Sequence, residues 1–403
     1  MVTSPLSVLH FLLLGRGPGE GPVTVQRDAR IDVIRGLALL IIFINHMPGH
    51  VLAGYTPHNY GFSDAADIFV LLAGVSATLA FGSIIEKRGL AIAGLRIGAR
   101  LWTLYIAHIA MFIIVCGVVA AAVTRTQNPV YVEAINIQPF FSDTFSALVD
   151  ALLLRYQPSY LDILPLYIVL LAGFPLIYCA ARRSPALTLL ASVALWQGAV
   201  ALGLNLPNVH AAGWFFNPFA WQVIFTCGVV LGLGVQRGVS VPRLPWLDVA
   251  AVGYVLLSLV AKVSSGNPLG LALLNDWFDS VQLGTDKTNL AWSRLLHVLA
   301  LAWLAMRWLP SGDALLRPAI GRGLAGVGRH ALDVFCAGTV LSILGQIVLA
   351  ETGFALLPQL LYSLAGVTFL VGLGMFLTWY QSITLTGAPD ARASAQRVSA
   401  SPR

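Results

Sequence analysis

Charged residues are scarce in this chain: Asp, Glu, Lys and Arg make up 10% of its 403 residues, whereas 57% are hydrophobic. Soluble domains carry about 25% charged residues, so most of this surface cannot face water. The apolar runs, about twenty residues each, match the length of helix that crosses a hydrocarbon layer about 30 Å thick. The alternating pattern of a membrane β-strand is absent. The composition therefore predicts an all-α integral membrane protein.

The chain also lacks the patterns of metal, disulfide and nucleic-acid sites. Its four cysteines lie singly inside apolar runs and none forms a CxxC pair, so we expect neither a metal ion nor a disulfide. Lys and Arg stand singly or in pairs along the chain and form no basic patch, so nucleic acid is not an expected partner.

Ten apolar segments are predicted to cross the membrane. They cover residues 32–48, 65–85, 98–123, 161–181, 186–204, 216–236, 245–263, 290–309, 327–350 and 355–381. With the N-terminus in the cytoplasm, 19 of the 24 Lys and Arg residues fall on the cytoplasmic side, as the positive-inside rule requires. The pattern predicts about ten transmembrane helices with both termini cytoplasmic. We divide the chain into a flexible N-terminal segment (1–30), a transmembrane domain (31–382) and a disordered cytoplasmic tail (383–403).

The first predicted span carries ionisable residues, which are costly in a membrane and are functional candidates by default. Arg35 and His46 are eleven residues apart, so both project from one helix face, about 16 Å apart along the axis. An imidazole titrates near neutral pH and can accept a hydroxyl proton or carry an acyl group. We predict a catalytic role for His46 with Arg35. The alternatives are that His46 only ends the helix and that Arg35 only serves topology.

Further polar residues lie at the predicted outer ends of later spans. Asp64 suits a helix N-terminus, and Asp67, one turn deeper, is a catalytic candidate that orients a histidine or contacts substrate. Trp214 belongs either to the interfacial aromatic belt or to a surface that stacks on sugar rings. The residues predicted to bind an acceptor are Asp64, Asp162, Trp214, Asn217 and Lys287.

Four arginines at predicted cytoplasmic ends are candidates for binding the phosphates of a donor. Guanidinium groups bind phosphate in a bidentate manner. Each of the four also obeys the positive-inside rule, so topology is the alternative explanation. They are Arg96, Arg100, Arg322 and Arg329.

Six segments resemble the OpgC family, within the acyltransferase-3 superfamily of membrane acyltransferases. In chain order they are RIDVIRGLALLIIFINHMPG, GFSDAADIFVLLAGVSA, YLDILPLYIVLL, GWFFNPFAWQ, DKTNL and GRHALDVFCAGTVLS. Together they run over roughly residues 27–350. The R-x10-H spacing of the superfamily is filled by Arg35 and His46, which the resemblance identifies as the motif arginine and the catalytic histidine.

The resemblance implies a ten-helix enzyme of the bacterial inner membrane that uses cytoplasmic acyl-CoA as a co-substrate and holds no bound cofactor. Its family members are associated with succinylation of osmoregulated periplasmic glucans. The family pattern has an acid before the histidine, where this chain has Asn45. An amide can hydrogen-bond an imidazole, but it cannot stabilise an imidazolium by charge.

We therefore expect an O-acyltransferase whose partners are acyl-CoA, a periplasmic glucan or other glycan, and the lipid bilayer. A transporter or export partner for a glycan or acyl carrier would use buried polar residues equally well, but the internal repeats of many transporters are not visible. A scaffold for a glycan-synthesis complex is the third possibility, and it alone would tolerate loss of His46.

Overall fold

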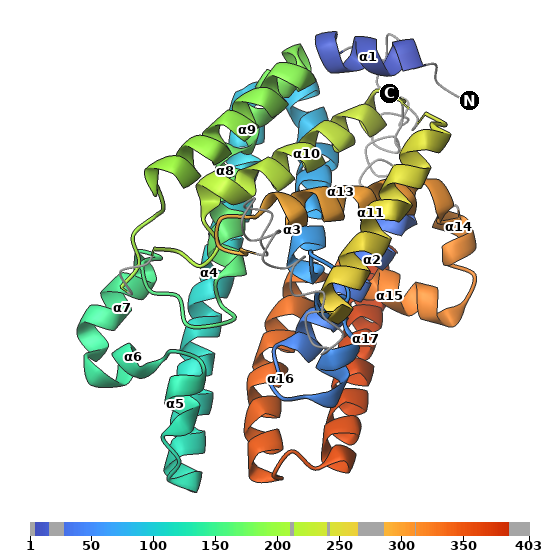
Figure 1. Cartoon of the computed structure of the whole chain (residues 1–403). Helices are drawn as coiled ribbons and strands as arrows, with labels where there is room; N and C mark the ends of the chain where they lie inside the picture. Colours follow the sequence, from blue (N-terminus) through green and yellow to red (C-terminus); the bar gives the residue numbers. More distant parts are fainter. Residues whose placement is uncertain are drawn as a thin grey trace, which may run out of the picture.

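The computed structural model describes residues 5–15, 28–209, 213–239, 242–264, 286–310 and 312–386. Every regular element in these residues is a helix (Figure 1). The long helices are α2 (Ala29–Asn45), α3 (Ala65–Ala77), α4 (Ser83–Thr126), α8 (Ile163–Arg183), α9 (Pro185–Leu202), α10 (Pro218–Gln236), α11 (Pro245–Ser264), α13 (Trp292–Trp308), α16 (Ala331–Glu351) and α17 (Leu356–Thr386). The short ones are α1 (Pro5–Leu14), η1 (Val51–Tyr55), η2 (Pro57–Asn59), η3 (Thr78–Gly82), α5 (Val130–Ala134), α6 (Gln138–Ser142), α7 (Thr144–Leu152), α14 (Gly312–Leu315) and α15 (Ala319–Arg329).

Each predicted span overlaps one of the long helices. Among the described residues, seven helical stretches are long and apolar enough to cross a membrane. One of the seven, Ala65–Thr126, contains two predicted spans, and α2 and α13 have 17 residues each. The chain is thus an all-helical, multi-pass membrane protein. The number ten and the cytoplasmic location of both termini stay predictions.

The boundary between the second and third predicted spans differs from the prediction. The sequence placed a loop between residues 85 and 98, but α4 is helical there apart from a break at Gly89. Gly89 has φ 81° and ψ 170°, a conformation that costs glycine little because it has no Cβ. One residue therefore interrupts the helix where a loop was expected.

Glycines bring two pairs of helices into close contact. Helix α2 packs on α15, where a Cβ added to Gly36 would lie 2.0 Å from the carbonyl oxygen of Leu324 and one added to Gly328 would lie 1.8 Å from that of Asp32. Small residues let helix backbones approach closely, which is how membrane helices gain packing energy. Helix α3 packs on α10 in the same way, and 78% of the α10 span is buried, which places it centrally.

The two ends of the chain are partly described. Helix α1 forms inside the segment predicted to be flexible, packs on α9, and buries Phe11; the sequence did not predict it. Residues 16–27 of that segment and residues 387–403 of the predicted tail lie outside the described residues. Helix α17 continues to Thr386, a few residues past the predicted end of the transmembrane domain.

Candidate functional site

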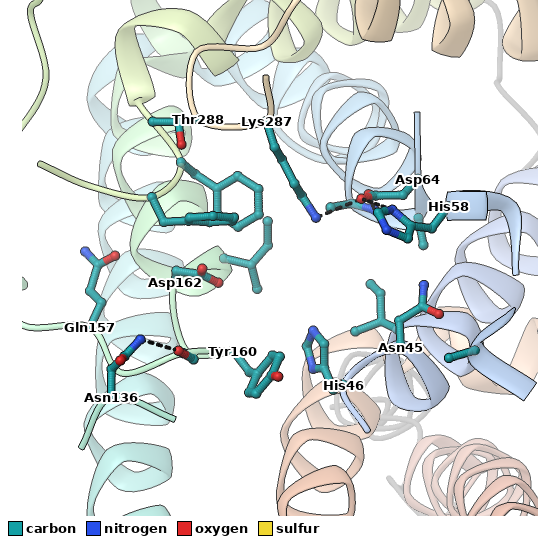
Figure 2. Close-up of a pocket in the computed structure, with 18 of the residues that line it drawn as sticks. Asn45, His46, His58, Asp64, Asn136, Gln157, Tyr160, Asp162, Lys287 and Thr288 are labelled. Atoms are coloured by element: carbon teal, nitrogen blue, oxygen red, sulfur yellow. Dashed lines mark hydrogen bonds and ion pairs between the residues drawn. The ribbon is translucent and has the colours of Figure 1, made fainter. Parts of the chain in front are cut away.

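A cavity of about 810 Å³ lies where several helix ends meet. It is formed by the C-terminal end of α2, the N-terminal ends of α3 and α8, and the segments that precede α10 and α13. In the predicted topology all of these lie on the outer side of the membrane. Figure 2 shows His46, Asp162 and Lys287 pointing into this space from different sides.

His46 is the residue at which α2 ends. Its backbone N–H donates to Ile42, and its carbonyl oxygen accepts a 2.6 Å hydrogen bond from the side chain of Gln346 on α16. The imidazole is half-buried and lines the cavity. Its Nδ1 is buried and has no hydrogen-bond partner among the described residues. The ring is thus placed by the backbone and by packing, with no side-chain hydrogen bond to Nδ1.

Tyr160 supplies that packing. Its ring centroid lies 4.5 Å from that of His46, with the planes at 41°. Tyr160 has φ 71°, a left-handed conformation that is unusual for an aromatic residue. The neighbouring Ser159 donates its N–H to Ile135 at 2.9 Å and accepts a 2.9 Å hydrogen bond from Asn136, both in the segment between α5 and α6. The segment between α5 and α6 therefore holds the backbone that places Tyr160 against His46.

The side chain of Asn45, the residue before His46, is engaged elsewhere. Its side-chain oxygen accepts a 2.7 Å hydrogen bond from Thr56 just after η1. In the part of the chain that the structure describes, no hydrogen bond joins Asn45 to the His46 ring. Asn45 fixes the loop after α2, and its amide does not orient the imidazole.

The N-terminus of α3 carries a charge cluster formed by two carboxylates and two cations. Asp64 lies 2.7 Å from Lys287 Nζ and 3.3 Å from Arg294, and Asp67 lies 2.5 Å from Arg294. Asp67 also accepts from the Asp64 N–H, while Asp64 accepts from Ala66, so the two acids form a capping box. Burial favours a raised pKa for Asp64, but the charges of Lys287 and Arg294 outweigh it and hold that pKa below its usual value.

Asp162 immediately precedes α8 and faces the cavity. Burial raises the pKa of its carboxyl to about 6, although the Lys287 charge opposes the rise. In the described residues its side chain makes no capping hydrogen bond to the helix. Asp162 is thus a polar group at the cavity wall, and its role in acceptor binding stays a prediction.

The remaining wall combines aromatic and amide side chains. Trp214 lines the cavity beside Phe215 and Phe216, and its indole N–H donates to the Pro207 carbonyl at 3.2 Å. The opposite part of the lining includes the amides of Asn136 and Gln157. Flat apolar faces together with amide donors and acceptors suit a polyhydroxylated ligand.

Three of the predicted catalytic and acceptor-binding residues do not line the cavity. Arg35 donates to Ser76 and to the carbonyl oxygens of Leu72 and Gly328. Asp67 is fully buried against Arg294, and among the described residues it forms no hydrogen bond with a histidine. Asn217 caps α10 and bonds to the carbonyl oxygen of Leu204 and to Asn289.

The four predicted donor-binding arginines lie on two helices. Arg96 and Arg100 are on α4, exposed and half-buried respectively. Arg322 and Arg329 are exposed on α15, where Arg322 donates to the carbonyl oxygens of Leu316 and Arg317 and Arg329 lies 3.4 Å from Asp32. Their role in donor binding stays a prediction.

Several residues at or beside the site were not predicted from the sequence, among them Tyr160, Arg294, Asn136 and Gln157. Tyr160 gave no signal, because neither its positive φ nor its contact with His46 can be read from a pattern. Arg294 does have a signal in the sequence, because it lies inside the predicted span 290–309 and a guanidinium there needs a buried partner. Among the described residues, no group of three or more His, Cys, Asp or Glu could hold a metal ion.

A comparison with protein families finds one match over nearly the whole helical domain. The family model described as OpgC protein matches residues 27–382. No curated protein and no solved structure matches the chain.

Proposed function

The chain belongs to the OpgC protein family, and from this premise we propose that it transfers an acyl group, succinyl first among the candidates, from cytoplasmic acyl-CoA to a hydroxyl of a periplasmic glucan or other extracytoplasmic glycan. The observation that carries the proposal is His46, whose imidazole faces a cavity of about 810 Å³ between a lysine and an aromatic wall. A base within reach of a substrate hydroxyl is what acyl transfer to a sugar needs.

The reaction is written with His46 as general base. Its imidazole takes the proton of a glycan hydroxyl while the hydroxyl oxygen attacks the thioester carbonyl carbon. The new C–O bond forms, the C–S bond breaks, and the departing thiolate of CoA takes the proton back from the imidazolium. The alternative is that His46 first carries the acyl group itself and the glycan then accepts it.

The composition of the cavity supports a glycan acceptor. Trp214 and Phe215 offer faces on which a sugar ring can stack, and Asp162, Asn136 and Gln157 offer hydrogen bonds to its hydroxyls. In the predicted topology the cavity opens to the outer side of the inner membrane, where such a polymer would be modified.

The donor would reach His46 from the cytoplasmic end. Arg35 lies eleven residues before His46, about 16 Å along the axis, and the predicted donor-binding arginines lie on α4 and α15. A narrow apolar crevice between α3 and α8, lined by Phe69 and Tyr167 among others, shares Ile163 with the cavity. This crevice has no room for a water molecule, so the arm of acyl-CoA would pass there only after the side chains that line it move apart.

Transfer of label tests the proposal directly. Purified full-length protein in detergent is given labelled succinyl-CoA or acetyl-CoA with glucan oligosaccharides, and the sugar is analysed for label. We expect transfer by the wild type, a loss of about 100-fold or more in His46→Ala, and unchanged transfer in His10→Ala, which alters an exposed histidine of α1. Equal transfer by wild type and His46→Ala would refute the role of His46. If the purified wild type transfers no label, and cells that lack the protein lose export of the glycan, a transporter is favoured.

A further inference from the structure

Lys287 is held in a fixed place at the edge of the cavity. The indole N–H of Trp221 donates to the Lys287 carbonyl oxygen at 2.8 Å. The backbone N–H of Asn217 donates to the carbonyl oxygen of Thr288 at 3.1 Å. The next residue, Asn289, accepts a 2.8 Å hydrogen bond from the indole of Trp196. These bonds tie the short segment before α13 to α9 and α10, so the backbone that carries Lys287 is held at three points.

The Lys287 side chain lines the same cavity as His46. Of the described residues that line the cavity, Lys287 alone is a lysine or arginine. Its side chain is 30% exposed, and its Nζ lies 5.5 Å from the centre of the Phe216 ring. Figure 2 shows the ammonium and the imidazole directed into the cavity from opposite sides.

The Lys287 ammonium has more N–H donors than its hydrogen bonds within the described residues use. An ammonium has three N–H groups, and within the described chain only Asp64 accepts a hydrogen bond from it. Asp64 does not depend on Lys287 alone, because it also accepts from the Ala66 N–H and lies 3.3 Å from Arg294. The ion pair thus orients the ammonium while leaving N–H groups that can point to a ligand.

We propose that Lys287 is the catalytic residue that stabilises the oxyanion formed during acyl transfer. This inference rests on the proposed function. When the glycan oxygen attacks the thioester, the carbonyl electron pair moves onto its oxygen, and a Lys287 N–H donates to that oxygen. The pair returns to restore C=O as the C–S bond breaks. A fixed cation in a site of low dielectric is effective because it needs no reorganisation as the charge appears.

The test separates catalysis from binding. In Lys287→Met we expect kcat to fall about 100- to 1000-fold, as for loss of one oxyanion donor, with the KM values for acyl-CoA and glucan oligosaccharide changed less than about threefold. Lys287→Arg should keep at least a tenth of the wild-type kcat. Arg155→Met is the matched control, because Arg155 is exposed, pairs with Asp150, and does not line the cavity; it should leave kcat unchanged.

A second measurement distinguishes a lost catalytic group from misfolding of Lys287→Met. In Lys287→Ala, added propylammonium should restore part of the kcat, whereas propanol, which lacks the charge, should not. A wild-type kcat in Lys287→Met overturns the proposal, and so does a loss seen only as a raised KM for the oligosaccharide, which would make Lys287 an acceptor-binding residue. Absence of amine rescue in a folded Lys287→Ala also counts against it. If the wild type transfers no acyl group at all, the proposed function itself fails.

Discussion

The ring of Tyr160 rests against the ring of His46, with centroids 4.5 Å apart, and it does so from a backbone with φ 71°. Such a conformation costs about 1–3 kcal/mol for a residue other than glycine and persists only where the surroundings hold it. Here the hydrogen bonds of Ser159 to Ile135 and Asn136 provide that hold. We interpret Tyr160 as the residue that positions the imidazole, whose Nδ1 has no hydrogen-bond partner within the described chain.

Removing the Tyr160 ring should therefore impair transfer more than removing its hydroxyl. We expect Tyr160→Phe to keep kcat within about threefold. Tyr160→Ala should lower kcat about 10- to 100-fold, since a displacement of about 1 Å at a reacting group can cost that much. Acyl transfer is measured across pH 5 to 9 for both variants. Equal kcat and the same pH profile in Tyr160→Ala and wild type would contradict the positioning role.

The buried pair of Asp67 and Arg294 should matter for stability. Removing one partner of a buried ion pair costs about 3–5 kcal/mol, because the other charge is left without compensation. Arg294→Met should therefore lower the thermal unfolding midpoint in detergent strongly, and the double variant Asp67→Asn/Arg294→Met should lose less than the sum of the two single variants. Arg155→Met, which breaks an exposed pair, should cost less than about 1 kcal/mol. Additive losses would mean that the two side chains are not coupled.

Asp162 should give stability a distinct pH dependence. Because its folded-state pKa is raised to about 6 from a usual 3.8, the folded protein holds this proton more tightly than the unfolded chain does. The contribution of this proton to the free energy of unfolding is full below about pH 4 and is lost as the pH rises through about 6. In Asp162→Asn the unfolding midpoint should match the wild type at pH 4 and exceed it at pH 7.5. A difference between the two proteins that stays constant from pH 4 to 7.5 would be inconsistent with the raised pKa.

The glycine contact between α2 and α15 should not tolerate a methyl group. In Gly328→Ala the new Cβ would lie 1.8 Å from the Asp32 carbonyl oxygen, so the helices must separate, at a cost of about 1–3 kcal/mol or more. Gly117→Ala on α4 is the control, because a Cβ there meets nothing within 4 Å and alanine favours a helix. Thermal unfolding should show a lowered midpoint for the first variant and an equal or higher one for the second. Equal midpoints would mean that the close approach adds no stability.

The sequence determined the properties that depend on a single segment. Membrane crossing follows from run length and apolarity, so all ten predicted spans coincide with helices. The candidates at span ends also depend on local position: His46, Asp64, Asp162, Trp214 and Lys287, each at the predicted outer end of a segment, line one cavity. The resemblance of six motifs pointed to the family that the comparison then matched over residues 27–382.

Only the tertiary structure decided which of these side chains meet. Asp64 pairs with Lys287 across 223 residues and Asp67 with Arg294 across 227, and no periodicity encodes a contact between helices so far apart in the chain. The same holds for Tyr160, whose left-handed backbone depends on hydrogen bonds from a different outer helix segment. The structure also has a helix with one break at Gly89 where the sequence predicted a loop. Span positions are thus a matter of local hydrophobicity, whereas the site is a product of long-range packing.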